Sequence, residues 1–179
     1  ELTSRCIRKV DDALGQYQPD FVIVQGDTTT AAATAQAALY RQRAIVHVEA
    51  GLRTGNIDSP FPEEFNRRLI SLAARLHYAQ LKVAGCLEDI DYRHPRGLKR
   101  AQIEQLRASQ WVAQHRSCLI TGPTGSGKTY LACALAHQAC RDGHRVCYYY
   151  APKLFRELQN AQADGSLLKL LKKLARAAL

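Results

Sequence analysis

An eight-residue stretch, GPTGSGKT at residues 122–129, has the residue types and spacing of a phosphate-binding loop. Its glycines let the backbone turn N–H groups toward an anion, and a helix starting at the loop would direct its positive end to the same point. Lys128 would neutralise the terminal phosphates of a nucleotide, and the Thr129 hydroxyl would ligate Mg²⁺. The predicted binding residues are Gly122, Pro123, Thr124, Gly125, Ser126, Gly127, Lys128 and Thr129.

The residues around the loop supply the context that this chemistry needs. An apolar run, RSCLIT at 116–121, predicts a strand that leads into the loop, and residues 128–143 predict a helix that ends at Gly143. A glycine-rich turn without a ligand is the alternative interpretation. Strand, loop and helix in this order favour phosphate binding.

Hydrolysis of a nucleotide needs more than this loop. P-loop ATPases hold Mg²⁺ with an acid at the end of a second core strand, and they orient the attacking water with another residue. After residue 150 no apolar run ends in Asp or Glu. The run FVIVQGD ends in Asp27, but it lies upstream of the loop and would break the chain order of P-loop folds. We therefore expect nucleotide binding without competent hydrolysis.

Three carboxylates in the first part of the chain could do a different chemistry. Asp27 and Glu49 follow two short apolar runs, and Glu63 follows a turn-rich loop. Ligands of open α/β sheets bind beyond the carboxyl ends of strands, so these carboxylates could share one crevice and move protons at carbon. The simpler interpretation, which spacing alone favours, is that Asp27 caps the next helix and Glu63 stabilises a helix N-terminus.

Apolar spacing predicts one βαβ unit near the N-terminus, preceded by a helix over 2–17. Residues 19–27 and 44–51 predict buried strands, and the alanine-rich residues 28–42 between them predict a helix capped by a threonine. Parallel pairing of the two strands follows from the helical connection. After a turn-rich loop, a helix is expected over 62–76, with Pro62 as its first residue.

A second βαβ unit is predicted around the glycine loop. A helix over 99–112 precedes it, the strand and helix that flank the loop form its first half, and RVCYYY at 145–150 predicts the second strand. Two helices, over 152–165 and 166–179, follow. The predicted fold class is α/β, built from two partial parallel-sheet (βαβ) half-domains, one Rossmann-like and one of the P-loop type.

Charge changes where the apolar pattern changes. Residues 1–79 carry nine basic and nine acidic side chains, whereas residues 80–179 carry sixteen and seven, so the net charge of +9 lies in the second part. We predict domains over 1–79 and 97–179, with 80–96 as a junction. A basic segment favours contact with phosphate or nucleic acid, although an exposed basic helix face is the commoner cause of such charge.

Composition bounds the class of protein. The sequence has no apolar run of about 18 residues and no signal pattern, so we expect a cytoplasmic protein without membrane contact. Its six cysteines include no C-x-x-C pair, and we assign them no metal or disulfide. The chain starts at Glu1 and contains no Met, and we expect a fragment of a longer protein.

From Gln80 onward the chain resembles the IstB-like transposition helper ATPases, relatives of the DnaC helicase loaders. The resemblance is carried by the segments LEDIDYRHPRGL, LITGPTGSGKTYLACALAHQACRDGHRV and APKLFRELQNAQADGS. It implies an AAA+ type P-loop domain that binds ATP with Mg²⁺ through residues 122–129, assembles on DNA and assists a transposase. The family's acid, sensor and arginine finger would lie beyond Leu179, so the resemblance implies a truncated ATP-binding module.

Residues 1–79 resemble the non-hydrolysing UDP-N-acetylglucosamine 2-epimerases, in the segments PDFVIVQGDTTTAAATAQAALY, HVEAGLRTGNIDSPFPEEFNRRLIS and LHYA. In that family Asp27, Glu49 and Glu63 match the catalytic carboxylates of a site between two Rossmann-like domains. The second domain, which binds UDP and supplies a catalytic histidine, has no counterpart here, and we interpret His47 as structural. The resemblance implies part of an active site, without productive binding of a UDP-sugar.

The chain is thus interpreted as an epimerase fragment joined to the front of an unrelated ATPase, through insertion of a mobile element or through a mis-assembled reading frame. ATP binding without hydrolysis is the leading function. Epimerase activity and a non-functional remnant are the alternatives. Because each half holds about two strands, we expect open sheet edges and marginal stability.

Overall fold

The computed structural model describes residues 2–48, 54–93 and 97–179. It divides the chain into two compact units, Glu1–Tyr78 and Ala79–Leu179. Each unit is described by itself in the following paragraphs.

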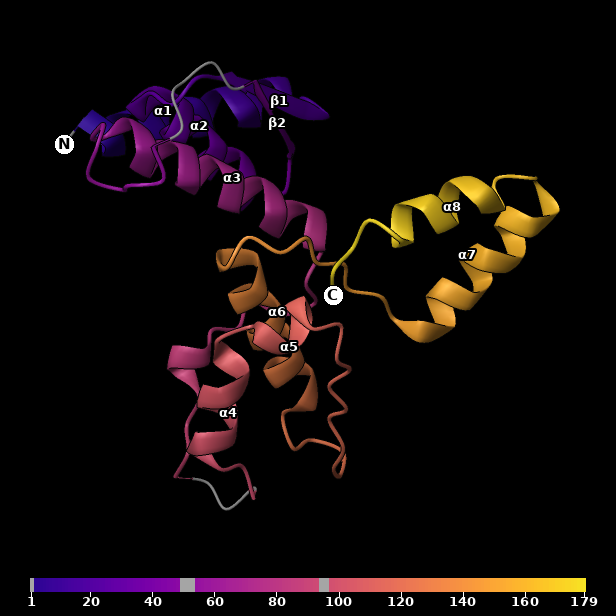
Figure 1. Ribbon diagram of the computed structural model, residues 1–179. Coiled ribbons are helices and arrows are strands. Elements are labelled where there is room, and N and C mark those ends of the chain that lie inside the picture. Colours follow the sequence, from indigo (N-terminus) through magenta and orange to yellow (C-terminus); the bar gives the residue numbers. More distant parts are fainter. Residues whose placement is uncertain (1, 49–53, 94–96) are drawn as a thin grey trace. The chain divides into compact units, whose positions relative to one another are not determined.

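The first unit is a βαβ unit with one helix before it and one after it (Figure 1). Its strands, β1 (Phe21–Gln25) and β2 (Ala44–Val48), pair in parallel, with Ile23 opposite Val46. The elements between and around them are α1 (Leu2–Tyr17), α2 (Thr29–Tyr40) and α3 (Glu63–Ala79). The βαβ arrangement predicted from apolar spacing is therefore confirmed.

The core of the first unit lies between one face of this sheet and the helices. Val24 of β1 and Ile70 of α3 are buried in one cluster with the alanines of α2, and Leu14 of α1 packs against α2 in a second cluster. Small side chains let α2 approach the sheet closely: its buried residues are Ala31, Ala32, Ala33, Ala35, Ala37 and Ala38. The opposite face of the sheet is open, with Phe21, Ile23, Val46 and Val48 between 45% and 60% exposed.

Polar contacts fix the ends of α2. The Thr28 hydroxyl accepts a hydrogen bond from the backbone N–H of Ala31 at 3.2 Å, so a threonine caps this helix, as predicted, and Asp27 does not. After the last turn, Arg41 pairs with Asp11 of α1, with Nε to Oδ1 at 2.5 Å and Nη2 to Oδ2 at 2.8 Å. The Arg41 hydrogen bond lowers the pKa of Asp11 below its ordinary value.

The second unit consists of helices in the residues that the structure describes. They are a short 3₁₀ helix η1 (Leu87–Asp89), α4 (Arg100–Arg107), α5 (Gln110–Ala113), α6 (Lys128–Arg141), α7 (Ala151–Ala163) and α8 (Leu167–Leu174). Leu87, Ile103, Ala134 and Leu135 form a buried cluster that joins η1, α4 and α6. Gly143 adopts φ +95° just beyond α6, where His144 N–H bonds to Ala139 O, which confirms the predicted end of this helix.

Two strand predictions in the second unit are wrong. Residues 116–121 and 145–150 run as irregular backbone and form no strand, and Figure 1 draws them without arrows. A strand exists only where a neighbouring backbone pairs its N–H and C=O groups. Among the described residues the only two strands, β1 and β2, pair with each other in the first unit.

The helix predicted over 99–112 is also interrupted. Ser109 has φ +51°, a left-handed conformation that ends α4 and precedes α5. The buried Ser109 still accepts at its carbonyl from the N–H groups of Val112 and Ala113, so the chain turns at this point and then resumes a helical course.

The segment 80–96, predicted to be a junction, contains packed residues in its described part. Leu87 is 5% exposed, and the Tyr130 hydroxyl of α6 donates to the backbone oxygen of Cys86 at 3.2 Å. Glu88 accepts from Arg107 at 2.9 Å and from Arg141 at 2.8 Å. These contacts fasten η1 to α4 and α6.

Among the helices that the structure describes, none combines the length and the apolar character that crossing a bilayer requires.

Candidate phosphate-binding site

The predicted phosphate loop has a backbone that only glycine adopts readily. Gly122, Gly125 and Gly127 have φ values of +149°, +81° and +86°. At Gly122 the space is restricted as well, because a Cβ atom there would meet the Ser126 hydroxyl at 3.2 Å. Side chains at these positions would strain the turn, which explains why the sequence has glycines at this spacing.

The Lys128 ammonium is directed into the loop. Its Nζ donates to the backbone oxygens of Gly122 at 2.9 Å and of Pro123 at 2.6 Å. From this position the ammonium could rotate toward the phosphate oxygens of a nucleotide bound at the loop. The structure therefore brings the predicted lysine and the predicted glycines together.

The N-terminus of α6 supplies unpaired donors at this point. Gly127 is the N-cap and provides no side-chain acceptor, and the helical ladder begins with Leu131 N–H to Gly127 O at 2.9 Å. Lys128, Thr129 and Tyr130 have backbone N–H groups without an acceptor among the described residues. A helix end of this kind attracts anions through its free N–H groups and its dipole.

A small cavity of about 120 Å³ adjoins the loop. Its polar side is formed by residues of the loop, and its apolar side by Ile90, Leu98, Ile120, Tyr130 and Leu131. The Thr129 side chain is exposed and does not line this cavity. Its assignment as an Mg²⁺ ligand stays a prediction.

Of the three predicted catalytic carboxylates in the first unit, the structure describes two. Asp27 lies in the turn after β1, and Glu63 is the first residue of α3, while Glu49 lies outside the described residues. Asp27 and Glu63 make no side-chain hydrogen bond or ion pair with another described residue, and their shared crevice stays a prediction. His47 Nε2 donates to Gly26 O at 2.9 Å and so fastens β2 to the turn that carries Asp27.

Among the described residues of the first unit the buried carboxylate is Glu64, one residue after the predicted Glu63. Glu64 is 1% exposed, and it accepts from Arg67 Nε at 2.8 Å, Arg67 Nη2 at 2.6 Å and Arg68 Nε at 3.1 Å. The hydrogen bonds from Arg67, followed by those from Arg68, lower the pKa of Glu64 to about 2 against the opposing effect of burial. The E-x-x-R-R spacing, with arginines at i+3 and i+4, was the signal that could have identified this pair.

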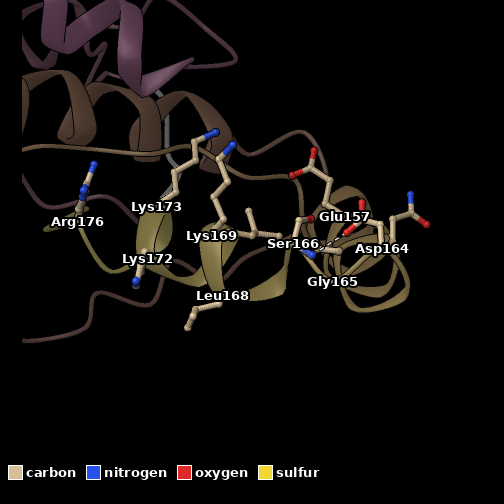
Figure 2. A pocket seen from close by; sticks show the side chains of 12 residues that line it. Glu157, Asp164, Gly165, Ser166, Leu168, Lys169, Lys172, Lys173 and Arg176 are labelled. Atoms are coloured by element: carbon tan, nitrogen blue, oxygen red, sulfur yellow. Dashed lines mark hydrogen bonds between the residues drawn. The ribbon is translucent and has the colours of Figure 1, made fainter.

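A basic hollow lies along α7 and α8. Residues 151–179, which form this helical hairpin, carry six basic and two acidic side chains. Lys169, Lys172, Lys173 and Arg176 line a hollow of about 910 Å³, together with Glu157 and Asp164. Figure 2 shows Lys169 and Lys173 extending from one side of α8, and Leu168 and Lys172 from the other.

Glycine turn, inward lysine and open helix end define a P-loop nucleotide-binding module. Comparison with known families agrees. The chain belongs to the IstB-like ATP binding protein family, whose model matches residues 61–179. An insertion sequence ATP-binding protein of Sinorhizobium fredii is 44% identical over 108 residues, which cover 60% of this chain and 44% of the relative. An insertion sequence IS1162 ATP-binding protein of Pseudomonas fluorescens is 45% identical over 103 residues, covering 58% and 43%.

A second family model, that of UDP-N-acetylglucosamine 2-epimerase, matches residues 1–85, so the chain is a chimera of two segments. The epimerase of Bacillus subtilis is 52% identical over 79 residues, which cover 44% of this chain and 21% of the relative. The crystal structure of the Neisseria meningitidis epimerase bound to UDP-GlcNAc is 48% identical, covers 42% of this chain and 20% of that chain, and has a TM-score of 0.40. The chain thus spans less than half the length of the first relatives and about a fifth of the epimerases.

Proposed function

We propose that this protein binds ATP with Mg²⁺ at residues 122–129 and does not hydrolyse it at a useful rate. The observation that carries the proposal is the Lys128 ammonium held 2.9 Å from Gly122 O, inside a glycine turn that ends at the open N-terminus of α6. Membership in the IstB-like family supports ATP as the nucleotide.

The absence of a core sheet in the described residues of the second unit supports the proposal that the protein does not hydrolyse ATP at a useful rate. P-loop ATPases place a magnesium-binding acid at the end of a core strand next to the loop. The described residues of this unit form no strand, and no carboxylate lines the cavity at the loop. Nucleotide is therefore expected to bind and leave unchanged.

Lys128→Ala tests the binding site. We expect the affinity for ATP, measured by calorimetry with Mg²⁺ present, to fall by at least tenfold, because the charge-assisted bonds to phosphate oxygens are lost. Lys82→Ala removes the same charge from an exposed position that does not line the cavity at the loop, and it is expected to bind ATP like the unmodified chain. Equal affinities in the chain and in Lys128→Ala would refute ATP binding at this loop.

DNA is the proposed partner of the basic hairpin. The relatives are proteins of insertion sequences, and the four cations of the hollow present a surface suited to a phosphate backbone. A transposase is the second proposed partner, on the strength of the family resemblance alone.

Isomerisation of UDP-N-acetylglucosamine is the second candidate function. Asp27 and Glu63 in a segment that matches the epimerase model favour it. The described first unit offers a single two-stranded sheet with one open face, and we expect no turnover. A coupled assay for UDP-N-acetylmannosamine measures this, and product formation that disappears in Glu63→Gln would establish the isomerase instead.

A further inference from the structure

Tyr130, the third residue of α6, joins the phosphate loop to a distant segment of the second unit. Its hydroxyl donates to the backbone oxygen of Cys86 at 3.2 Å, although the two residues are 44 positions apart in the chain. The same side chain lines the cavity at the loop. Tyr130 therefore contacts both the cavity and the segment that precedes η1.

Gly85 makes room for this contact. It is buried, and a Cβ atom there would meet the Tyr130 ring at 3.1 Å from Cε2 and at 3.3 Å from Cδ2 and Cζ. The φ of Gly85 lies outside the left-handed region that favours glycine. The close approach of the Tyr130 ring, and not the backbone conformation, therefore explains the glycine at this position.

The segment that Tyr130 contacts continues into one wall of the cavity. Leu87 of η1 is buried in the cluster that joins η1 to α4 and α6, and both Tyr130 and Ile90 pack against that cluster. Ile90 then lines the cavity together with residues of the phosphate loop. Because this wall and the loop come from separate stretches of the chain, the distance between them depends on contacts such as that of Tyr130 with Cys86.

We propose that Tyr130 is a positioning residue for the nucleoside half of ATP, a role that rests on the proposed function. By holding Cys86 beside the first turn of α6, Tyr130 keeps the wall at Ile90 where it covers the part of ATP beyond the phosphates. The phosphates need only residues 122–129, which form one continuous stretch, so their binding does not depend on this contact. The hydrogen bond can favour the competent arrangement by no more than its own net contribution, a factor of about two to ten.

The test compares ATP with inorganic triphosphate, each with Mg²⁺, by calorimetry on the full chain. Tyr130→Phe keeps the ring and removes the hydroxyl. We expect this variant to bind ATP about two- to tenfold more weakly and to bind triphosphate with unchanged affinity. Tyr17→Phe changes an exposed tyrosine of the first unit and is expected to alter neither affinity.

Gly85→Ala tests the same contact from the opposite side. The added methyl group displaces the Tyr130 ring, so we expect the same selective loss of ATP affinity. Because both substitutions break one contact, the double variant should bind ATP about as weakly as the weaker single variant. Gly15→Ala is the matched control, since a Cβ atom there meets the Arg41 guanidinium of the first unit at 3.0 Å.

Three results would overturn the role of Tyr130 while ATP binding at the loop stands. The first is equal ATP affinity in Tyr130→Phe and the unmodified chain. The second is an equal loss of ATP and triphosphate affinity in that variant, which would mean that the hydroxyl only supports the loop. The third is failure of triphosphate to bind the unmodified chain, because residues 122–129 would then not hold phosphates by themselves. Failure of ATP to bind the unmodified chain would instead remove the proposed function, and the role of Tyr130 with it.

Discussion

Adjacent glutamates in the sequence PEE have different surroundings. Glu63 begins α3 and is half-buried without a described partner, whereas the Glu64 side chain has no exposed surface and is held by Arg67 and Arg68. The resemblance to the epimerases assigns a catalytic role by position in the sequence motif, and the residue at that position is Glu63. The i+3 and i+4 arginines could have indicated the ion pairs of Glu64, but burial depends on which way α3 faces, so only the structure shows that this carboxylate is buried.

The pairing of Glu64 predicts an acid-sensitive first unit. The pKa of Glu64 falls from its ordinary value of 4.5 to about 2 on folding. A carboxyl with a lowered pKa stabilises the fold fully above 4.5, and this contribution disappears as the pH falls toward 2. We expect the protection factors of the amides in α2 and α3, which correct for the pH dependence of the intrinsic exchange rate, to fall over this pH window, as measured by hydrogen exchange and mass spectrometry.

Glu64→Gln should lose most of this pH dependence and should be less stable at neutral pH, because the arginines lose their buried anion. Glu63→Gln removes a neighbouring carboxylate without a described partner and serves as the control. If both variants unfold at the same urea concentration and keep the same pH profile, Glu64 does not stabilise the first unit.

At the scale of elements, the helices other than the one interrupted at Ser109 were predictable, and the strands of the second unit were not. The caps and apolar faces that define α1, α2 and α6 lie within each helix, and local sequence contains them. A strand depends on a neighbour that can be far away in the chain. RSCLIT and RVCYYY have the composition of strands, but the described residues provide no neighbouring strand for them to pair with, so the two strand predictions were wrong. The glycine loop was predictable because its conformation is encoded by glycines alone.

The α7–α8 hairpin predicts salt-dependent binding to DNA. Each phosphate contact contributes about 0.9 to the slope of log K against log salt concentration for duplex DNA. Lys172→Ala with Lys173→Ala removes two cations of the hollow, and alanine preserves the helix. We expect the slope to fall by about 2, as measured by fluorescence anisotropy of a labelled duplex over a salt series.

Lys82→Ala with Lys99→Ala removes the same charge from exposed positions outside the hairpin, so it separates local contact from net charge. If this control lowers the slope as much as the hairpin variant does, the attraction is a property of the whole charge and the hairpin is not a binding surface.

At the scale of the molecule, the two family models overlap over residues 61–85, which include α3. The changes in charge and apolar pattern near residue 79 placed the helix predicted over 62–76 in the first part. Ile70 and Ala73 of α3 are buried with Val24 of β1, so most of the helix completes the core of the first unit. Only its last residue, Ala79, belongs to the second unit, where its carbonyl accepts from Tyr148 N–H at 2.9 Å.

This division predicts that ATP stabilises one unit and not the other. A ligand that binds only the folded form stabilises it by about 2.7 kcal/mol when present at 100 times its Kd. Bound at the start of α6, ATP with Mg²⁺ is expected to slow amide exchange in α6 by up to about 100-fold wherever exchange requires unfolding of the second unit. Exchange in α2, and in α3 up to Ala73, should stay unchanged, since these residues pack in a separate core. Lys128→Ala should abolish the protection from amide exchange that ATP gives to α6, without altering exchange in α2. If ATP slows exchange in α2 and α6 of the unmodified chain equally, the two units unfold as one.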